Sequence, residues 1–402
     1  MVSVIPKFRV VPPSTAQKAT DNKANHVLFF GAEHQLVREA TTTCKLSSNQ
    51  KKNVTRVAGT YEQLELLEKE LAKRNSKHTS ALQRYLHPKK IWRSKNQTFA
   101  LDQPTIMGIV NLTTDSFSGE GVGDNISEAI KHAYSLKTAG ASIIDIGGES
   151  ARGSRPRLTV KEEIELVIPV VKALAQDGFC ISVDTYKREV AQTAIDAGAE
   201  IINDISGHTV GTGALEEAAQ AGAGYVLNFN QSVPKQRVIP PPEYEDVMAE
   251  TIDWMTNRLL DIEKSIKNLE YVAIDPGIAF GKSHDDDIQI FRRLGELGTF
   301  GLPILLAHSR KNYIGSISGR NPEERDLETH ISTGLAYAQG ARIFRVHDVA
   351  GTKRALMIAS ALTTSEPGNF APNNTWPWSE KATAMPAVGN NLERKPPPGQ
   401  RW

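Results

Sequence analysis

Residues with ligand-binding chemistry recur directly after short apolar runs in this chain. The run at 106–110 ends at Asn111, and Thr, Asp and Ser residues follow it. Six later apolar stretches also end in polar residues, at 143–150, 181–184, 201–204, 272–277, 304–311 and 343–348. Polar groups at the carboxyl ends of successive parallel strands form the active site of a (β/α)8 barrel. The spacing therefore predicts a barrel whose carboxyl-terminal rim carries the chemistry.

Two carboxylates and one amide on this rim suit a flat heterocycle with several N–H and carbonyl groups. Asp184, Asn203 and Asp275 stand at the ends of the third, fourth and sixth predicted strands. An ionised carboxylate only accepts hydrogen bonds, whereas an amide both donates and accepts them. Each Asp could instead cap the helix that follows its strand. Three such residues at three strand ends favour the ligand-binding interpretation.

A second set of residues suits an anion. It follows the second, seventh and eighth predicted strands and comprises Arg152, Ser309, Arg310, Lys311, Arg345 and His347. The loops after strands seven and eight form the phosphate site of many barrels, and Arg binds phosphate oxygens through two parallel hydrogen bonds. Asn111 and nearby oxygens could hold a Mg²⁺ ion that shares the phosphates. Ser-Arg-Lys is also common in solvated turns, but here it closely follows the apolar run 304–306, which favours the rim.

Other patterns narrow the function. Phe280 follows the sixth predicted strand, where it could stack on a ring or pack in the core. His208, His284 and His308 are isolated in the sequence, and we assign them no role. The sequence has neither a Gly-x-x-x-x-Gly-Lys-Ser/Thr loop nor a His/Cys cluster with zinc spacing. These patterns argue against a P-loop nucleotidase and against a zinc protein.

The elements that position these residues alternate eight times between strand and helix patterns, within residues 91–363. Predicted strands begin near residues 106, 142, 180, 200, 224, 271, 303 and 342. Predicted helices follow at 125–139, 161–175, 187–197, 212–221, 243–266, 285–297, 322–339 and 351–363. This alternation predicts an α/β fold with a parallel sheet, and eight units in about 260 residues match a (β/α)8 TIM barrel. A hairpin at 92–101 is expected to plug the amino-terminal end of the barrel.

Three further segments are expected outside the barrel. Residues 1–25 mix Pro with small polar residues and are predicted to be a disordered leader. Residues 26–90 are predicted to be a small α/β extension, with a strand at 26–30 and helices at 33–40, 61–73 and 76–85. Residues 364–402 form a Pro/Asn-rich tail that we expect to be flexible. In an alternative interpretation, the tail is pinned to a surface by Trp376, Trp378 and Trp402.

Composition is that of a globular protein with a large core, since 40% of the 402 residues are hydrophobic. No apolar run approaches the ~18 residues of a membrane helix, and residues 1–7 lack the basic-then-apolar order of a secretory signal. Membrane partners are therefore not expected. The two cysteines, Cys44 and Cys180, give no disulfide framework, which favours the cytoplasm.

Charge is unevenly distributed along the chain. Residues 1–100 carry 18 Lys or Arg against 7 Asp or Glu, a net charge of +11, and the remaining residues carry −10. A basic segment can signal contact with nucleic acid. This one lacks regular Arg–aromatic interleaving and zinc spacing, so we expect a solubilising segment and no nucleic-acid partner.

From about residue 92 to residue 361, the motifs together resemble the dihydropteroate synthase family. They are Met-Gly-Ile-x-Asn-x-Thr with Asp-Ser-Phe-Ser, Ile-Ile-Asp-Ile-Gly-Gly-Glu-Ser, Ile-Ser-Val-Asp-Thr, Ile-Asn-Asp-Ile, Asp-Pro-Gly-Ile-x-Phe-Gly-Lys, Ser-Arg-Lys and Arg-Val-His-Asp. The resemblance implies condensation of a dihydropterin methyl pyrophosphate with p-aminobenzoate, with pyrophosphate as the second product. It also implies a homodimer, formed through helices in the C-terminal half. The extension at 26–90 is similar, much more weakly, to one that some members carry.

The resemblance also implies roles for individual residues. Pterin would be held by Asp184, Asn203, Asp275 and Lys311, with Arg345 stacked against it. Pyrophosphate and Mg²⁺ would be held by Asn111, Arg152 and His347. We accordingly expect catalytic roles for Asp184, Lys311 and Arg345, a metal-binding role for Asn111, and substrate binding by Asn203, Asp275, Phe280, Ser309, Arg152 and His347. In the family mechanism pyrophosphate leaves first, and the arylamine attacks the pterin cation. An acidic site favours that developing positive charge, and a cationic rim stabilises the leaving anion.

The loops after four strands depart from the family pattern. Thr114 replaces a Pro, and residues 118–121 replace Ser-Asp-Gly-Gly. Residues 149–154 read Glu-Ser-Ala-Arg-Gly-Ser in place of Glu-Ser-Thr-Arg-Pro-Gly. Ala307-His308 replaces a Gly before the Ser-Arg-Lys sequence, and Asn228-Phe229-Asn230 replaces Met-His-Met after strand five.

These departures leave the arylamine open, as p-aminobenzoate or a substituted relative, and leave two other functions open. One is a pterin-dependent methyltransferase that uses methyl-tetrahydrofolate. Such an enzyme has no pyrophosphate for the residues at 309–311 to hold. The other is a non-catalytic pterin-binding scaffold protein, which would bind pterin without turnover and co-purify with a partner.

Overall fold

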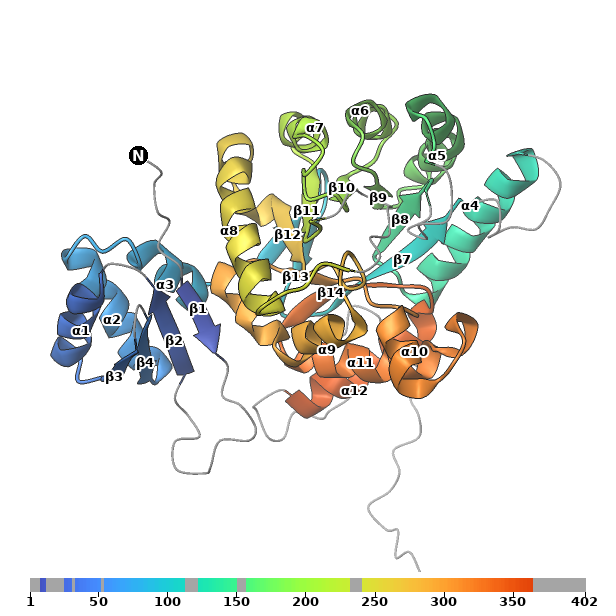
Figure 1. The fold of residues 1–402 in the computed structure, drawn as a ribbon. Coiled ribbons are helices and arrows are strands. Elements are labelled where there is room, and N and C mark those ends of the chain that lie inside the picture. Colours follow the sequence, from blue (N-terminus) through green and yellow to red (C-terminus); the bar gives the residue numbers. More distant parts are fainter. Residues whose placement is uncertain are drawn as a thin grey trace, which may run out of the picture. The chain divides into compact units, whose positions relative to one another are not determined.

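The computed structural model describes residues 8–11, 25–30, 33–51, 54–112, 122–149, 157–231 and 241–363. They form an α/β module near the N-terminus and a closed barrel of eight parallel strands with helices around it (Figure 1). The expected fold class, a (β/α)8 TIM barrel, is confirmed. The predicted tail at 364–402 and most of the predicted leader lie outside the described residues.

The N-terminal module is a four-stranded antiparallel sheet with three helices. In chain order its elements are β1 (Phe8–Val11), β2 (Asn25–Phe30), α1 (His34–Thr43), β3 (Ser47–Lys51), β4 (Val54–Gly59), α2 (Tyr61–Lys73) and α3 (Thr79–Leu86). The strand order is β1-β2-β4-β3. Helix α2 has the bounds expected from the sequence, and a capping box between Thr60 and Gln63 satisfies two N–H groups of its first turn.

Three strands of this sheet differ from the sequence-based expectation. Strand β3 contains no apolar residue, and its pairing with β4 holds it extended. Strand β4 alternates in burial along its length and is not among the strands expected from the sequence. Strand β1 lies inside the segment expected to be disordered; its Phe-Arg-Val-Val sequence pairs with β2. These strands depend on pairing partners that the local sequence does not reveal.

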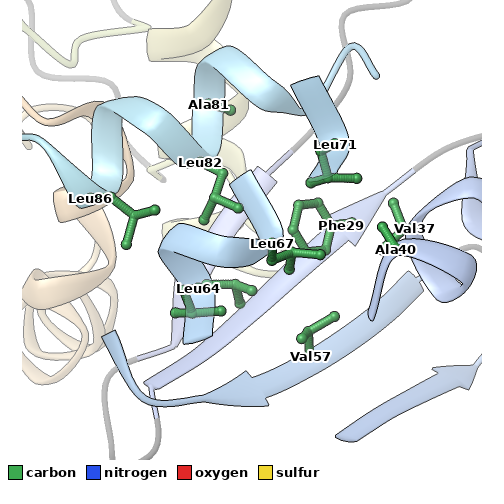
Figure 2. Packing of buried hydrophobic residues seen from close by; sticks show 11 residues of the cluster. Phe29, Val37, Ala40, Val57, Leu64, Leu67, Leu71, Ala81, Leu82 and Leu86 are labelled. Atoms are coloured by element: carbon green, nitrogen blue, oxygen red, sulfur yellow. The ribbon is translucent and has the colours of Figure 1, made fainter. Parts of the chain in front are cut away.

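The module has a hydrophobic core of its own (Figure 2). Phe29 of β2 lies in this cluster. Val27 belongs to it as well and shares the same face of the sheet, because alternate residues of a strand point to one side. Leu67 and Leu71 of α2 pack in the same cluster, at the helical spacing of four residues. All buried members of this cluster lie between residues 27 and 86.

The barrel consists of eight parallel strands that close on themselves. In chain order they are β7 (Thr105–Asn111), β8 (Ile143–Gly147), β9 (Ile181–Asp184), β10 (Ile201–Asp204), β11 (Gly224–Asn228), β12 (Val272–Asp275), β13 (Ile304–Leu306) and β14 (Ala341–Val346). Pairing of β14 with β7 closes the ring. Each strand begins within one residue of its expected start, because the apolar runs mark buried strands directly.

Helices follow each strand, as the alternation predicts. They are α4 (Val122–Ala139), α5 (Val160–Gln176), α6 (Arg188–Asp196), α7 (Gly213–Ala221), α8 (Val247–Ser265), α9 (His284–Arg292), α11 (Asp326–Ala338) and α12 (Val349–Thr363). Shorter elements are the helix α10 (Asn312–Ser318) and the 3₁₀ turns η1 (Leu269–Tyr271), η2 (Leu294–Phe300) and η3 (Pro322–Glu324). Helix α9 ends before its expected end, and η2, which contains Gly295 and Gly298, takes over the chain. No described helix is long and apolar enough to cross a membrane.

A hairpin covers the amino-terminal end of the barrel, as expected. Its strands are β5 (Ile91–Arg93) and β6 (Thr98–Ala100). Trp92 is fully buried in one cluster with residues near the starts of the barrel strands, among them Met107, Ile143 and Ile201. The amino-terminal end of the barrel is thus filled by apolar side chains, and the carboxyl-terminal rim is left for polar ones.

Candidate functional site

The site residues face the barrel interior because of strand periodicity. Ile201 and Ala273 belong to the interior apolar cluster. Since side chains two positions apart on a strand share a face, Asn203 and Asp275 point inward as well, nearer the carboxyl-terminal rim. The same relation to interior residues holds for Asp145, Asn228 and Arg345, and Asp184 lies four positions after Cys180 of the same cluster. An apolar layer therefore supports a polar layer above it.

Strand register brings the expected pterin-binding residues together. Asn203 lies opposite Asp184 in the β10–β9 pair. Asp275 lies opposite Asn228 in the β12–β11 pair. All four side chains are buried. The spatial convergence expected from the sequence is therefore present on one rim.

The alternative interpretation of the two Asp residues as helix caps is wrong. The N-cap of α6 is Lys187, and that of α9 is Ser283, whose hydroxyl accepts from Asp286 N. Asp275 instead accepts a hydrogen bond from Gly277 N at 2.8 Å, which fixes the turn after β12. Its other carboxylate oxygen is left for another partner, and burial raises the pKa of this group, while nearby Lys311 opposes the shift.

Arg345 joins two acids across the barrel. Its Nε donates to Asp145 Oδ2 at 2.6 Å, and its Nη2 donates to Asp184 Oδ2 at 3.1 Å. Burial raises the pKa of Asp145, and the guanidinium of Arg345 acts in the opposite direction. Asp145 lies outside the set of residues expected at the site, although an Asp inside the apolar run Ile-Ile-Asp-Ile is itself a signal of a buried partner.

Lys311 is held at the rim by the loop after β12. Its Nζ donates to Ile278 O at 2.5 Å and lies 4.6 Å from the centre of the Phe280 ring. Burial lowers the pKa of Lys311 to about 8, although nearby Asp275 favours the charged form. Phe280 is only half-buried, which disfavours the core interpretation and leaves its ring available beside the lysine.

A second lysine organises the same loop and was missed in the sequence. Lys282 Nζ donates to Gly277 O at 2.7 Å and to Phe280 O at 2.9 Å, and it lies 4.3 Å from the centre of the Phe229 ring. Burial lowers its pKa to about 7, while Asp287 acts to raise it. The buried Lys282 and the half-buried Lys311 thus hold three carbonyl groups of one loop, and this fixes the backbone that carries Phe280.

The expected anion-binding set is only partly cationic in the structure. Arg310 is turned to Asp326, which it contacts through two hydrogen bonds of 2.7 Å. Ser309 Oγ lies 2.9 Å from His347 Nδ1 and accepts from His347 N at 3.3 Å. Burial, with Arg310 and Arg345 nearby, lowers the pKa of His347 to about 3. The imidazole is therefore neutral at pH 7, and Arg310 already has a carboxylate partner.

Asn111 lies at the rim next to Asp184. A Cβ atom built on Gly147 would be 3.5 Å from both Asn111 Oδ1 and Asp184 Cβ, so the glycine keeps space between these groups. No cluster of three or more His, Cys, Asp or Glu that could hold a metal ion is present in the part of the chain that the structure describes. Arg152 lies outside the described residues.

Comparison with known proteins agrees with this architecture. The family described as pterin binding enzyme matches residues 107–347. The dihydropteroate synthase of Escherichia coli strain K12 is 40% identical over 267 residues, which cover 66% of this chain and 94% of that protein. The Synechocystis enzyme of the same name is 38% identical over 64% of this chain and 89% of its own length.

Solved structures give the same result. A Yersinia pestis dihydropteroate synthase in complex with a sulfonamide drug has a TM-score of 0.64 and 36% identity, covering 68% of this chain and 98% of that one. A Xanthomonas albilineans dihydropteroate synthase in complex with 7,8-dihydropteroate has a TM-score of 0.62 and 36% identity, covering 69% and 100%. Together, the barrel, the polar rim and these similarities define a pterin-binding barrel enzyme. The chain belongs to the dihydropteroate synthase family, and it is a transferase.

Proposed function

We propose that this protein condenses a dihydropterin methyl pyrophosphate with p-aminobenzoate or a related arylamine. The carbon–oxygen bond to pyrophosphate breaks, a carbon–nitrogen bond to the amine forms, and the amine loses a proton. The observation that supports this most strongly is the convergence of Asp184, Asn203, Asp275 and Lys311 on one rim. The hydrogen-bond acceptors and donors that these four side chains offer match a ring system with several N–H and carbonyl groups.

The side chains divide the chemistry between them. Asp275 and Asn203 accept hydrogen bonds from the pterin, and Lys311 donates one. Asp184, paired with Arg345, lies where positive charge on the pterin is stabilised once pyrophosphate departs. Arg345 provides a flat, fixed guanidinium, since two carboxylates hold it. These groups are oriented before the substrate arrives, so little reorganisation opposes the reaction.

The pyrophosphate end is assigned to Asn111, Arg152, Ser309 and His347. His347 is neutral and Ser309 Oγ lies at its Nδ1, so we assign the ring proton to Nε2, where it can be donated to a phosphate oxygen. Asn111 Oδ1 is a hard oxygen ligand that suits Mg²⁺, which is commonly bound by few protein groups together with water and substrate phosphates. When bound, the ion would neutralise charge on the leaving group.

Phe280 is assigned to the arylamine. Its half-buried ring lies against Lys311, on a loop fixed by Lys282. An aromatic face at this place can pack against the ring of p-aminobenzoate. The departures at residues 114, 118–121 and 150–154 lie outside the described residues, so the choice among arylamines rests on assay.

Turnover gives the direct test. Purified protein is incubated with dihydropterin methyl pyrophosphate, Mg²⁺ and each of several arylamines, and pyrophosphate release and the pteroate product are measured. Release that depends on an arylamine supports the proposal. No release with any arylamine, or methyl transfer from methyl-tetrahydrofolate in a parallel assay, contradicts it.

We also propose that the protein is a homodimer, formed through helices α11 and α12. Leu327, Ile331 and Leu335 of α11 are 66%, 57% and 61% exposed and lie on one stripe at spacings of four residues. A Cβ on Gly334 would lie 3.6 Å from Ala359 of α12, so this stripe adjoins the exposed apolar residues of that helix. An apolar stripe of this kind favours contact with a second copy. Light scattering should give twice the chain mass, and Ile331→Glu should give a monomer.

We further propose that the protein is located in the cytoplasm. Cys44 and Cys180 are free thiols in the described chain, which suits the reducing cytoplasm. Titration of both thiols in freshly lysed cells checks this.

The separate core between residues 27 and 86 supports a division into an extension at 26–90 and a barrel at 91–363. Limited proteolysis of the whole chain should cut first outside these two segments.

A further inference from the structure

Asn228 occupies a position among the pterin-binding residues that our assignment of roles does not use. It ends β11, two residues after Val226 of the interior apolar cluster, so its side chain faces inward. Register places it opposite Asp275 on one side. On the other side, β10 carries Asn203, which lies opposite Val226. Asn228 therefore stands between two of the groups assigned to the pterin.

The amide of Asn228 has an unmet hydrogen-bonding capacity. The residue is 1% exposed, and its Oδ1 has no hydrogen-bond partner among the described residues. The neighbouring Asn203 Oδ1 is in the same condition. A buried acceptor without a partner destabilises the folded state, and folded proteins pair nearly all such groups. Two adjacent unmet acceptors on a ligand-binding rim indicate that a ligand with N–H donors supplies the partners.

Backbone geometry supports the placement of this amide at the site. Gly277 has a φ of +66°, and a Cβ atom there would collide with Phe229 O and lie 2.9 Å from Asn228 Oδ1. The glycine thus lets the loop after β12 come close to the amide. That loop carries Phe280, whose N–H donates to Gly277 O at 3.1 Å. Asn228 therefore adjoins Asp275 and the turn at Gly277 that leads to Phe280.

We propose that Asn228 is a further specificity-determining residue, whose amide oxygen accepts a hydrogen bond from an N–H group of the pterin ring system. This inference rests on the proposed function, because that function supplies the heterocycle. The family pattern has Met at this position, and a thioether is a weak acceptor. The chain consequently gains a strong acceptor where a weak one is usual.

Calorimetric titration with 6-hydroxymethyl-7,8-dihydropterin tests the assignment. Asn228→Met and Asn228→Ala should each weaken binding about tenfold, the value of one buried hydrogen bond. Their dissociation constants for inorganic pyrophosphate should equal that of the unmodified protein. The methionine variant preserves volume and serves if the alanine variant folds poorly.

Asn230→Ala is the matched control. Asn230 is a buried amide two residues further on, but it donates to Ile205 O at 3.0 Å and so has a structural partner. This variant should unfold at a lower temperature with its pterin affinity unchanged. The inference is overturned if Asn228→Met binds the dihydropterin as tightly as the unmodified protein, or if its binding of pterin and pyrophosphate weakens equally. Because the readout is binding, a protein that binds pterin without releasing pyrophosphate would contradict only the proposed function.

Discussion

Arg345 Nε donates to Asp145 Oδ2 across 2.6 Å, which joins the last strand of the barrel to its second strand. The side chain of Asp145 is fully buried, and that of Arg345 is 14% exposed. Two charges that are removed from water in this way are stable together but costly apart, because a single buried charge keeps the full cost of lost hydration. The Arg345–Asp145 pair therefore helps to hold the barrel closed and also fixes the position of Arg345 in the site.

Replacement of Arg345 by Met should lower the free energy of unfolding by about 3–5 kcal/mol, because it leaves Asp145 and Asp184 buried without their cation. Urea denaturation measures this change. The matched control is Arg310→Met, which removes a half-exposed pair with Asp326 and should cost about 1 kcal/mol or less. Equal losses in the two variants would contradict the role assigned to Arg345.

Binding of the pterin should weaken as pH rises through about 8. Burial lowers the pKa of Lys311 to about 8, so the ammonium that donates to the ligand is lost above that pH. The Lys311→Arg variant stays charged there, so its affinity should not show this loss. At each pH between 7 and 9, the dissociation constant of the unmodified protein is divided by that of the Lys311→Arg variant. Ionisation of the ligand affects both constants equally and so cancels in this ratio. A ratio that stays constant over this range would refute the prediction.

The lowered pKa of Lys311 also makes the free energy of unfolding depend on pH. An unfolded lysine titrates near 10.4, so between about pH 8 and 10 the unfolded chain binds more protons than the folded one. Stability from this group therefore rises with pH over that window. Lys311→Met should remove this contribution, and the pH dependence of the unfolding free energy of the two proteins should differ in the predicted direction.

The barrel and its rim could be read from the sequence because they follow local rules. Apolar runs mark the buried strands. Side chains two positions apart on a strand face the same side, so the residue two positions after an interior residue such as Ile201 is a site residue, here Asn203. Asp145 and Asn228 obey the same rule. The partner of Asp145 is not visible in the local sequence, because Arg345 lies 200 residues further along the chain. Asn228 stands out in the sequence only as a departure from the family pattern.

Other features could not be derived because they depend on distant partners. Strand β3 forms through its pairing with β4 and has no apolar residue of its own. Arg310 and Lys311 are adjacent in sequence, yet a backbone φ of +59° at Arg310 accompanies the turn of its side chain to Asp326. The neutral state of His347 depends on burial. The sequence gives residue types, whereas their charge states and partners are set by packing.

His347 should remain neutral over the whole physiological pH range. Its pKa is lowered to about 3 by burial and by nearby Arg310 and Arg345, so it binds fewer protons than an unfolded histidine below about pH 6.5. Stability from this group should therefore fall as pH drops from about 6.5 to 3. Nuclear magnetic resonance of the ring protons, assigned with His347→Asn, should show no titration between pH 8 and 5. A midpoint near 6.5 would contradict the neutral donor assigned here.

Lys187 should contribute strongly to stability because it ties together segments on both sides of residues 150–156. Its Nζ donates to Glu149 Oε1 at 2.7 Å, to Leu158 O at 2.7 Å and to Glu163 Oε2 at 2.5 Å. Both carboxylates are buried. Lys187→Met should leave these two acids without their shared cation and lower the free energy of unfolding by about 3 kcal/mol or more.

The control for this prediction is Lys161→Met. Lys161 is 84% exposed and lies 3.8 Å from Glu165, so its loss should not change stability measurably. Because Glu149 and Glu163 can take up protons once Lys187 is replaced, the stability deficit of this variant should shrink as pH falls toward 5. Urea midpoints of both variants at pH 5 and 7.5 measure this. A deficit that is independent of pH would mean that Lys187 acts through packing of its alkyl chain and not through its charge.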